Sequence, residues 1–236
     1  MQQKENNILK NFIQYVTSNV CGMIGLSCYI LADTFFIANG LGADGLAALN
    51  LAIPIYSFIH GSGLMLGMGG ATKYSIFRGQ KNYRQADNVF TNVICLAAVS
   101  AIVFVLMGVF LSGTLTSILG ADSAIFDMTK TYLKVLLIFA PAFLLNDVLI
   151  CFVRNDGGPR LAMTAMLLGS LANIILDYIF IFPMQMGILG AVLATGAAPV
   201  ISMSILAKHW ITKQNNFHLR RLGICPNLTK TILSLG

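Results

Sequence analysis

Apolar residues are grouped along the chain into six long segments, each bounded by turn residues or by charge. A helix that crosses a bilayer needs about 20 mostly apolar residues, and every one of these segments is long enough. The expected helices are Phe12–Asn39, Ala47–Ala71, Val89–Leu111, Tyr132–Val153, Leu161–Phe182 and Gly187–Ala207. The pattern therefore predicts an all-α integral membrane protein, a bundle of six transmembrane helices.

The connections between these segments alternate in charge. Gly40–Gly45, Ser112–Asp127 and Pro183–Gly187 carry little positive charge, whereas Lys73–Arg84, Arg154–Arg160 and Lys208–Lys230 are basic. Of the 15 lysines and arginines, only Lys130 and Lys134 fall on the less basic side. Positive residues are retained on the cytoplasmic face of a membrane. We therefore expect a multi-pass protein of the cell membrane with both termini in the cytoplasm.

The composition supports a lipid environment. Hydrophobic residues make up 56% of the chain and charged residues 10%, and the mean hydropathy is +0.77. A soluble domain has about 25% charged residues, so this chain cannot cover a water-facing surface. The net charge of +6 then reflects topology and the anionic inner leaflet rather than nucleic-acid binding.

Several familiar signatures are missing from the sequence. The polar stretch Met1–Lys10 does not lead into a short apolar run with a cleavage site, so no removable signal peptide is expected. No Ser/His, HExxH or paired catalytic motif is found, and we expect neither an enzyme nor a cofactor. The cysteines lack metal-ligand spacing and are interpreted as small buried hydrophobic residues: Cys21, Cys28, Cys95, Cys151 and Cys225.

Prolines and glycines interrupt the expected helices. Pro54, Pro141 and Pro199 lie inside the second, fourth and sixth segments, where proline frees a carbonyl group and bends the axis. Glycines crowd the end of the second segment, at 61, 63, 67, 69 and 70. They indicate either close helix packing or a helix that bends during function.

Two acids lie where a bilayer disfavours them. Asp33 is seven residues before Gly40 and Asp177 six before Pro183, which places both about 10 Å below the outer boundary. Thr195 reaches a similar depth on the descending sixth helix, and Asn173 shares a helix face with Asp177. Acids at this depth face a bundle interior and point to ion or proton pathways.

These side chains could converge in one pocket. Two carboxylates, an amide oxygen and a hydroxyl suit a hard cation such as Na⁺. Burial and a second carboxylate also favour the uncharged acid, so the pocket could equally bind H⁺. The residues leave the choice between Na⁺ and H⁺ open.

Asn146 and Asp147 are less easily interpreted. They lie in the fourth segment, six residues beyond Pro141 and seven before Arg154. Asp147 either pairs with a basic residue near the cytoplasmic edge or lines a cavity. Candidates for a cavity or gating role are Asn146, Asp147 and Pro141.

Four stretches in this order resemble multidrug and toxic compound extrusion (MATE) transporters. They are LADTFFIANGLGADGLAALNLAIPI, GMGGATKYSIFRGQKNYRQADNVF, FVRNDGGPRLAM and NIILDYIFIFPMQMGILGAVLAT. The resemblance implies an antiporter that exports organic, often cationic, drugs in exchange for H⁺ or Na⁺ by alternating access. By position it also implies a cation site at Asp33, Asn173, Asp177 and Thr195, with the Ala191 carbonyl as a further ligand.

Such transporters normally have twelve helices in two six-helix lobes. The resemblance therefore implies that residues 1–212 form one lobe and that 213–236 is a cytoplasmic linker toward a missing second lobe. TKTILSLG at the end of the chain looks like the approach to a seventh helix. A second six-helix lobe and the lipid bilayer are the expected partners, along with small organic substrates.

Other readings are a lipid-linked saccharide flippase of the same superfamily, a cation channel and a non-transporting membrane protein. A flippase would favour cationic residues in its cavity, whereas the centre of this lobe has acids. Acids at matched depth disfavour a scaffold but do not separate a transporter from a channel.

Overall fold

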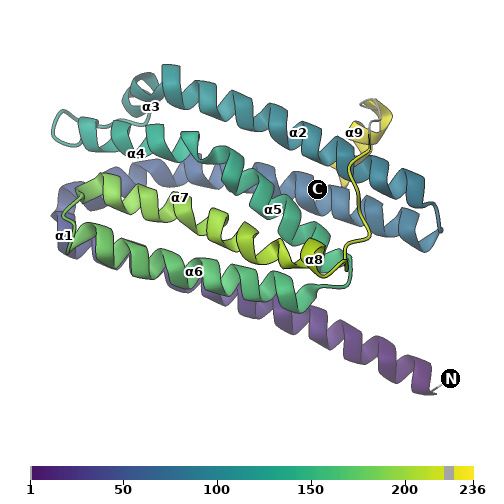
Figure 1. The fold of residues 1–236 in the computed structure, drawn as a ribbon. Coiled ribbons are helices and arrows are strands. Elements are labelled where there is room, and N and C mark those ends of the chain that lie inside the picture. The colour runs from purple at the N-terminus through teal and green to yellow at the C-terminus, as the bar shows by residue number, and fades with distance from the viewer. Residues whose placement is uncertain (1, 221–225) are drawn as a thin grey trace.

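The computed structural model describes the backbone of residues 2–220 and 226–236, and within these ranges every regular element is a helix (Figure 1). The side chains described are those of residues 12–220 and 228–236. The helices are α1 (Gln2–Gly79), α2 (Tyr83–Phe110), α3 (Ser112–Ile118), α4 (Phe126–Ile138), α5 (Ala140–Asn155), α6 (Pro159–Ile181), α7 (Gly187–Leu206), α8 (Lys208–Ile211) and α9 (Pro226–Leu235).

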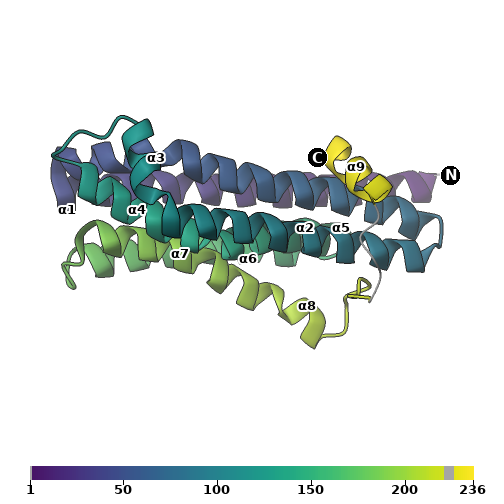
Figure 2. The same cartoon turned by 90° about the horizontal axis from the view of Figure 1, so that it is seen from above.

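Helix α1 contains two membrane crossings. A straight helix of 78 residues would be about 117 Å long, several times the ~30 Å hydrocarbon core of a bilayer. It reverses at Gly42, whose φ of 70° and ψ of −158° are not helical, a conformation that glycine adopts without a Cβ clash. The first arm (2–41) and the second arm (43–79) run antiparallel (Figures 1 and 2). The expected six-residue connection Gly40–Gly45 is thus wrong, because one glycine makes the turn.

The fourth expected segment, Tyr132–Val153, is not one helix. It divides into α4 and α5, bent by 48°, with Pro141 in the first turn of α5. Proline lacks the amide hydrogen that would continue the helix. Pro54 lies inside the second arm of α1 and Pro199 inside α7, and neither interrupts its helix, so only Pro141 of the three marks a break.

The remaining bounds differ from expectation mainly at one end of the bundle. The second arm continues to Gly79 rather than Ala71, and α2 begins at Tyr83 rather than Val89. The Asn82 side chain caps α2 by accepting from the Gln85 amide at 3.2 Å. Polar residues thus extend both helices beyond the apolar stretch that membrane crossing requires.

Six crossings follow from these elements. Four described helices are long and apolar enough to cross a membrane, and the bent pair α4–α5 adds a fifth crossing. One of the four is α1, whose two arms count separately because of the turn at Gly42. Large apolar side chains on the outside, such as Leu31, Phe35 and Phe58, suit contact with lipid. The fold class is confirmed as an all-α membrane bundle.

The glycines of the second arm permit close packing at several points. A Cβ at Gly67 would lie 3.0 Å from Cys151 Sγ, and one at Gly70 would lie 2.4 Å from Val93 Cγ2. A Cβ at Gly69 would meet the Ile232 carbonyl of α9. These contacts favour the packing role that small residues have in membrane helices.

The cysteines are less buried than expected. Cys151 is buried, Cys21 and Cys95 are partly exposed and Cys28 is exposed, so the interpretation as buried hydrophobic residues holds for Cys151 alone. Lipid can solvate an exposed thiol on a spanning helix, which removes the need for burial in protein. Cys225 lies outside the described residues.

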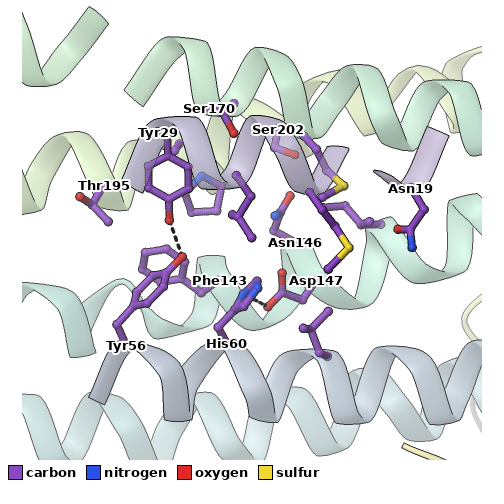
Figure 3. A pocket seen from close by; sticks show the side chains of 18 of the residues that line it. Asn19, Tyr29, Tyr56, His60, Phe143, Asn146, Asp147, Ser170, Thr195 and Ser202 are labelled. Carbon is purple, nitrogen blue, oxygen red and sulfur yellow. Dashed lines mark hydrogen bonds and ion pairs between the residues drawn. The ribbon is translucent and has the colours of Figure 1, made fainter. Parts of the chain in front are cut away.

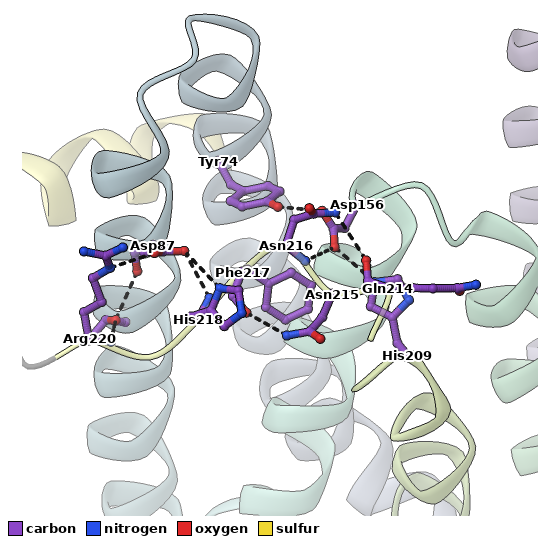
Figure 4. A network of polar contacts seen from close by, with 11 residues as sticks. Tyr74, Asp87, Asp156, His209, Gln214, Asn215, Asn216, Phe217, His218 and Arg220 are labelled. Atoms are coloured by element: carbon purple, nitrogen blue, oxygen red, sulfur yellow. Dashed lines mark hydrogen bonds and ion pairs between the residues drawn. The ribbon is translucent and has the colours of Figure 1, made fainter. Parts of the chain in front are cut away.

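Beyond α8, residues 214–220 form a strap across the ends of α1, α2 and α5 (Figure 4). Phe217 is fully buried and its ring packs against those of Phe90, Phe152 and Trp210, with centroids 4.6, 5.6 and 5.2 Å away. The region 213–236, expected as a linker, thus includes a docked strap and the helix α9. The end of the bundle that holds the strap is called the basic end below.

Candidate functional site

The structure brings together all of the residues that were predicted to form a cation site. Asp33 lies on the first arm of α1, Asn173 and Asp177 on α6, and Ala191 and Thr195 on α7. All five are buried, with exposed fractions between 0% and 6%. Their role in binding a cation stays a prediction, but their proximity agrees with the depth and helix periodicity of the sequence.

Hydrogen bonds link the members of this cluster. The Asp33 and Asp177 carboxyl groups lie close enough to interact, and a hydrogen bond between them would require a proton on one of the two. With its amide oriented to satisfy both neighbours, Asn173 donates to Asp177 Oδ2 at 3.0 Å and accepts from the Thr195 backbone amide at 3.2 Å. The Thr195 hydroxyl donates to the Ala191 carbonyl at 3.1 Å.

Two carboxylate oxygens of the cluster lack a hydrogen-bond partner. Asp33 Oδ1 and Asp177 Oδ1 are both buried without one among the described residues. Leaving such a group unsatisfied costs about 1–3 kcal/mol. A hard cation or a proton would satisfy these oxygens, so the donor set fits either coupling ion.

Tyr132 also belongs to this cluster and was not singled out in the sequence. It is buried on α4, and its side chain lies close to that of Thr195. A tyrosine at the edge of an apolar segment gives no sign of its direction, because its ring suits packing as well as hydrogen bonding.

A cavity of about 240 Å³ adjoins the cluster at Thr195 (Figure 3). It is bounded by both arms of α1 and by α5, α6 and α7, and Thr195 borders it. Its lining is mostly apolar and aromatic with a few polar groups, which is typical of small-molecule sites. Three of its methionines are Met23, Met68 and Met166.

Asn146 and Asp147 line this cavity, which answers the question that the sequence left open for Asp147. Asp147 also has a basic partner, His60, whose Nδ1 lies 2.8 Å from Asp147 Oδ2. Pro141 lies nearer the other end of α5, at its bend with α4. Arg154 reaches the cavity lining at the basic end.

Three further aromatic residues of the cavity were missed by sequence reasoning. Tyr29 and Tyr56 join the two arms of α1 through a 2.5 Å hydrogen bond between their hydroxyl groups. The Tyr56 ring stacks on His60, with centroids 5.9 Å apart and planes 10° from parallel. The one available signal for His60 was an ionisable residue inside an apolar segment, the same signal that identified Asp33.

Comparisons with known proteins agree with these features. Residues 20–179 match the family model MatE. The multidrug export protein MepA of Staphylococcus saprophyticus is 27% identical over 230 residues, covering 98% of this chain and 51% of that protein. MepA of Staphylococcus aureus is 27% identical over 197 residues, 84% of this chain and 44% of its own length.

Solved structures show the same arrangement of helices. A MOP superfamily transporter from Pyrococcus furiosus superimposes with a TM-score of 0.87 at 27% identity, over 96% of this chain and 50% of that one. A crystal structure of MATE in complex with MaD3S gives a TM-score of 0.88 at 27% identity, over 96% and 51%. The chain thus spans about half the length of the relatives that it matches.

Proposed function

Because the chain belongs to the MatE family, we propose that it is one lobe of a secondary active transporter that exports organic, often cationic, compounds in exchange for H⁺ or Na⁺. Relatives that are named multidrug export proteins support this proposal. So does the half-length match, since a second six-helix lobe would supply the other wall of a transport pathway.

The observation that carries the proposal is the pair of unpartnered oxygens on Asp33 and Asp177. Two carboxylates this close cannot both remain charged without a compensating cation. A proton or Na⁺ that binds between them removes the repulsion and satisfies Oδ1 of each acid. Release of that ion restores the repulsion, so occupancy can bias the packing of the first arm against α6.

The neighbouring groups divide the work within the cluster. Asn173 holds Asp177 from the same helix, and its oxygen is tied to the α7 backbone at Thr195. The Thr195 hydroxyl and the Ala191 carbonyl face each other one turn apart on α7. A Na⁺ ion would be bound by oxygen atoms from three helices, and a proton would need only the two carboxyl groups.

Thr195 also connects the ion cluster to the cavity, because it borders both. Binding of an ion at the cluster can therefore change the shape of the cavity through α7. The aromatic rings and methionines of the lining suit flat or cationic organic molecules through cation–π and thioether contacts. The central carboxylate Asp147 favours a cationic cargo over an anionic lipid carrier.

The topology of the proposal follows the charge pattern. The basic end, with both arms of α1 and the α5–α6 turn reaching it, would face the cytoplasm. Six crossings return the chain to the side on which it began, so a second lobe could insert in the same orientation. Residues 1–212 would then form the lobe, and 213–236 would lead toward its partner.

The test is transport by the chain together with its second lobe in vesicles under an H⁺ or Na⁺ gradient. Export of ethidium should fall by about 100-fold in Asp33→Asn and in Asp177→Asn, because each variant keeps only one carboxylate and so loses the repulsion that a bound ion relieves. Asp44→Asn, at an exposed acid near the turn of α1, should transport as wild type. Gradient-driven export at the wild-type rate in both site variants would refute the coupling role.

A further inference from the structure

A second ionisable pair lies in the cavity, on the side away from the Asp33–Asp177 cluster. His60 of the second arm faces Asp147 of α5 (Figure 3), and the His60 Nδ1 to Asp147 Oδ2 distance is 2.8 Å. The side chain of Asp147 is 5% exposed and that of His60 is 25% exposed. Both line the cavity, so the pair is accessible to a small molecule there yet largely shielded from bulk water.

The backbone around the pair leaves room for the carboxylate. Gly63 is three residues beyond His60, on the same face of the helix, and a Cβ there would lie 2.6 Å from Asp147 Oδ2. The stacked ring of Tyr56 fixes the His60 imidazole from the other side. Close packing between the second arm and α5 therefore fixes the position of the Asp147 side chain.

The pair keeps unused hydrogen-bonding capacity. Asp147 Oδ2 is close to His60 but is not aligned with it as a hydrogen bond, and the oxygen has no hydrogen-bond donor among the described residues. The neighbouring Asn146 Oδ1 is likewise buried without a donor. Two acceptor oxygens without donors, on residues that line a cavity with aromatic walls, suit a positively charged group.

Counting protons shows what the site can exchange. With one proton the pair is neutral overall, whether as imidazolium and carboxylate or as imidazole and carboxylic acid. Without it, Asp147 holds a buried negative charge that only another cation can compensate. A cationic ligand and the proton therefore compete for the same carboxylate.

The other charged groups near the pair do not replace this proton. Arg154 lines the cavity from α5, and its guanidinium lies 3.7 Å from the Met166 sulfur. From α1, Tyr29 and Tyr56 line the cavity. The Asp33 carboxyl group interacts electrostatically with Tyr56 from the side of the ion cluster. The lining residues of α6 and α7 are uncharged, and α2 contributes none.

We propose that the His60–Asp147 pair is a second exchange site of the lobe, separate from Asp33–Asp177, which holds either one proton or the positive centre of an aromatic organic cation. This inference rests on the proposed export function for its biological meaning. Its chemistry is local: the cation sits against the Asp147 carboxylate and the ring of Tyr56, and the displaced proton passes to water.

The proposal is tested by ethidium binding to the purified full chain in detergent. Calorimetry in two buffers of different ionisation enthalpy gives the number of protons released per ethidium. We expect about one proton for wild type, and an affinity that rises with pH. Asp147→Asn should bind ethidium at least 10-fold more weakly and release no proton, whereas Asp147→Glu should restore part of the release.

Two further variants separate this site from the ion cluster. In Asp33→Asn the proton release on ethidium binding should persist, while gradient-driven transport is lost. Asp44→Asn, at an exposed acid outside both sites, should keep the ethidium affinity and the proton release of wild type. His60→Gln keeps the carboxylate and should retain binding with an altered pH dependence, so it covers the case in which Asp147→Asn does not fold.

Three results would overturn the inference. They are wild-type chain that binds no ethidium, binding without proton release, and proton release that disappears in Asp33→Asn but persists in Asp147→Asn. The last result would leave the proposed coupling role of Asp33 intact. Conversely, transport that is insensitive to Asp33→Asn, with ethidium binding that depends on Asp147, would refute the coupling role alone.

Discussion

The lobe buries two kinds of aspartate, and they differ in how fully their oxygens are used. At the basic end, Asp156 accepts from Tyr74 Oη at 2.6 Å, His209 Nε2 at 3.0 Å and the Asn216 amide at 2.7 Å (Figure 4). In the membrane interior, Asp33 and Asp177 each keep one oxygen without any partner among the described residues. The same side chain is thus saturated in one place and left incomplete in another.

The aspartates whose oxygens are fully hydrogen-bonded hold the strap in place. Asp87 accepts from Arg220 Nε at 2.7 Å and from the His218 amide at 3.1 Å, so both acids bind strap residues. Burial, and after it the hydrogen bond to Asp156, raises the pKa of the Tyr74 phenol, which therefore stays protonated as a donor. A carboxylate whose two oxygens both accept hydrogen bonds is held in one conformation, whereas an acid with a free oxygen is available to bind an ion. We expect this contrast to separate structural acids from ion-binding ones.

The largest effect that the contrast predicts is at Asp156. Asp156→Asn replaces one carboxylate oxygen by an NH₂ group that faces N–H or O–H donors, so Tyr74 or His209 loses its acceptor. Breaking a buried charged network in this way costs about 3–5 kcal/mol. Thermal unfolding in detergent, followed by tryptophan fluorescence of Trp210 beside Phe217, should show a large drop in melting temperature.

A matched substitution gives the control for that drop. Asp44→Asn changes an exposed acid and should leave the melting temperature within error. If Asp156→Asn melted together with this control, the network at the basic end would not stabilise the lobe, and the distinction between the two kinds of acid would fail.

A smaller effect is expected at Asp87, because its partner Arg220 is half exposed. The Arg220 side chain is 50% exposed, and pairs of this kind contribute about 1 kcal/mol or less. Asp87→Asn should loosen the strap without unfolding the bundle. Trypsin should cut after Arg220 several-fold faster in the variant, since local opening exposes the backbone there.

The melting temperature of Asp87→Asn provides the check on this interpretation. It should change by only a few degrees while cleavage accelerates. Equal cleavage rates in the variant and wild type would mean that Phe217 alone holds the strap and that Asp87 adds nothing to it.

The sequence predicts the incomplete acids better than the saturated ones. Asp33 and Asp177 stand out because charge inside an apolar segment is costly, and helix periodicity adds Asn173 and Thr195. Asp87 and Asp156 lie in polar stretches where an acid is unremarkable. Their partners on the strap are separated from them by between 60 and 133 residues, so only the folded chain reveals the network.

The same limit explains why the His60–Asp147 pair was missed. Asp147 was identified as a candidate, but its partner depends on how the second arm and α5 are rotated about their axes. Hydrophobic periodicity gives that rotation only roughly, since both helices are apolar on most sides. Three prolines likewise suggested bends, but only Pro141 coincides with a helix break. Whether a helix tolerates a proline depends on whether neighbouring groups satisfy the freed carbonyl, and the sequence does not show those neighbours.

The smallest expected change in stability is at Asp177, and it separates the two kinds of acid most sharply. Asparagine at this position can still accept from Asn173, and its NH₂ group can donate to Asp33, so no donor is left without a partner. The substitution also removes one of two buried carboxylates that repel each other. The free energy of unfolding of Asp177→Asn should therefore lie within about 0.5 kcal/mol of the wild-type value, or above it. Substitutions at strained functional sites often have this effect. The same variant should lose gradient-driven export.

Destabilisation of Asp177→Asn as large as that of Asp156→Asn would instead mean that Asp177 is structural, and that its free oxygen has no role in binding an ion.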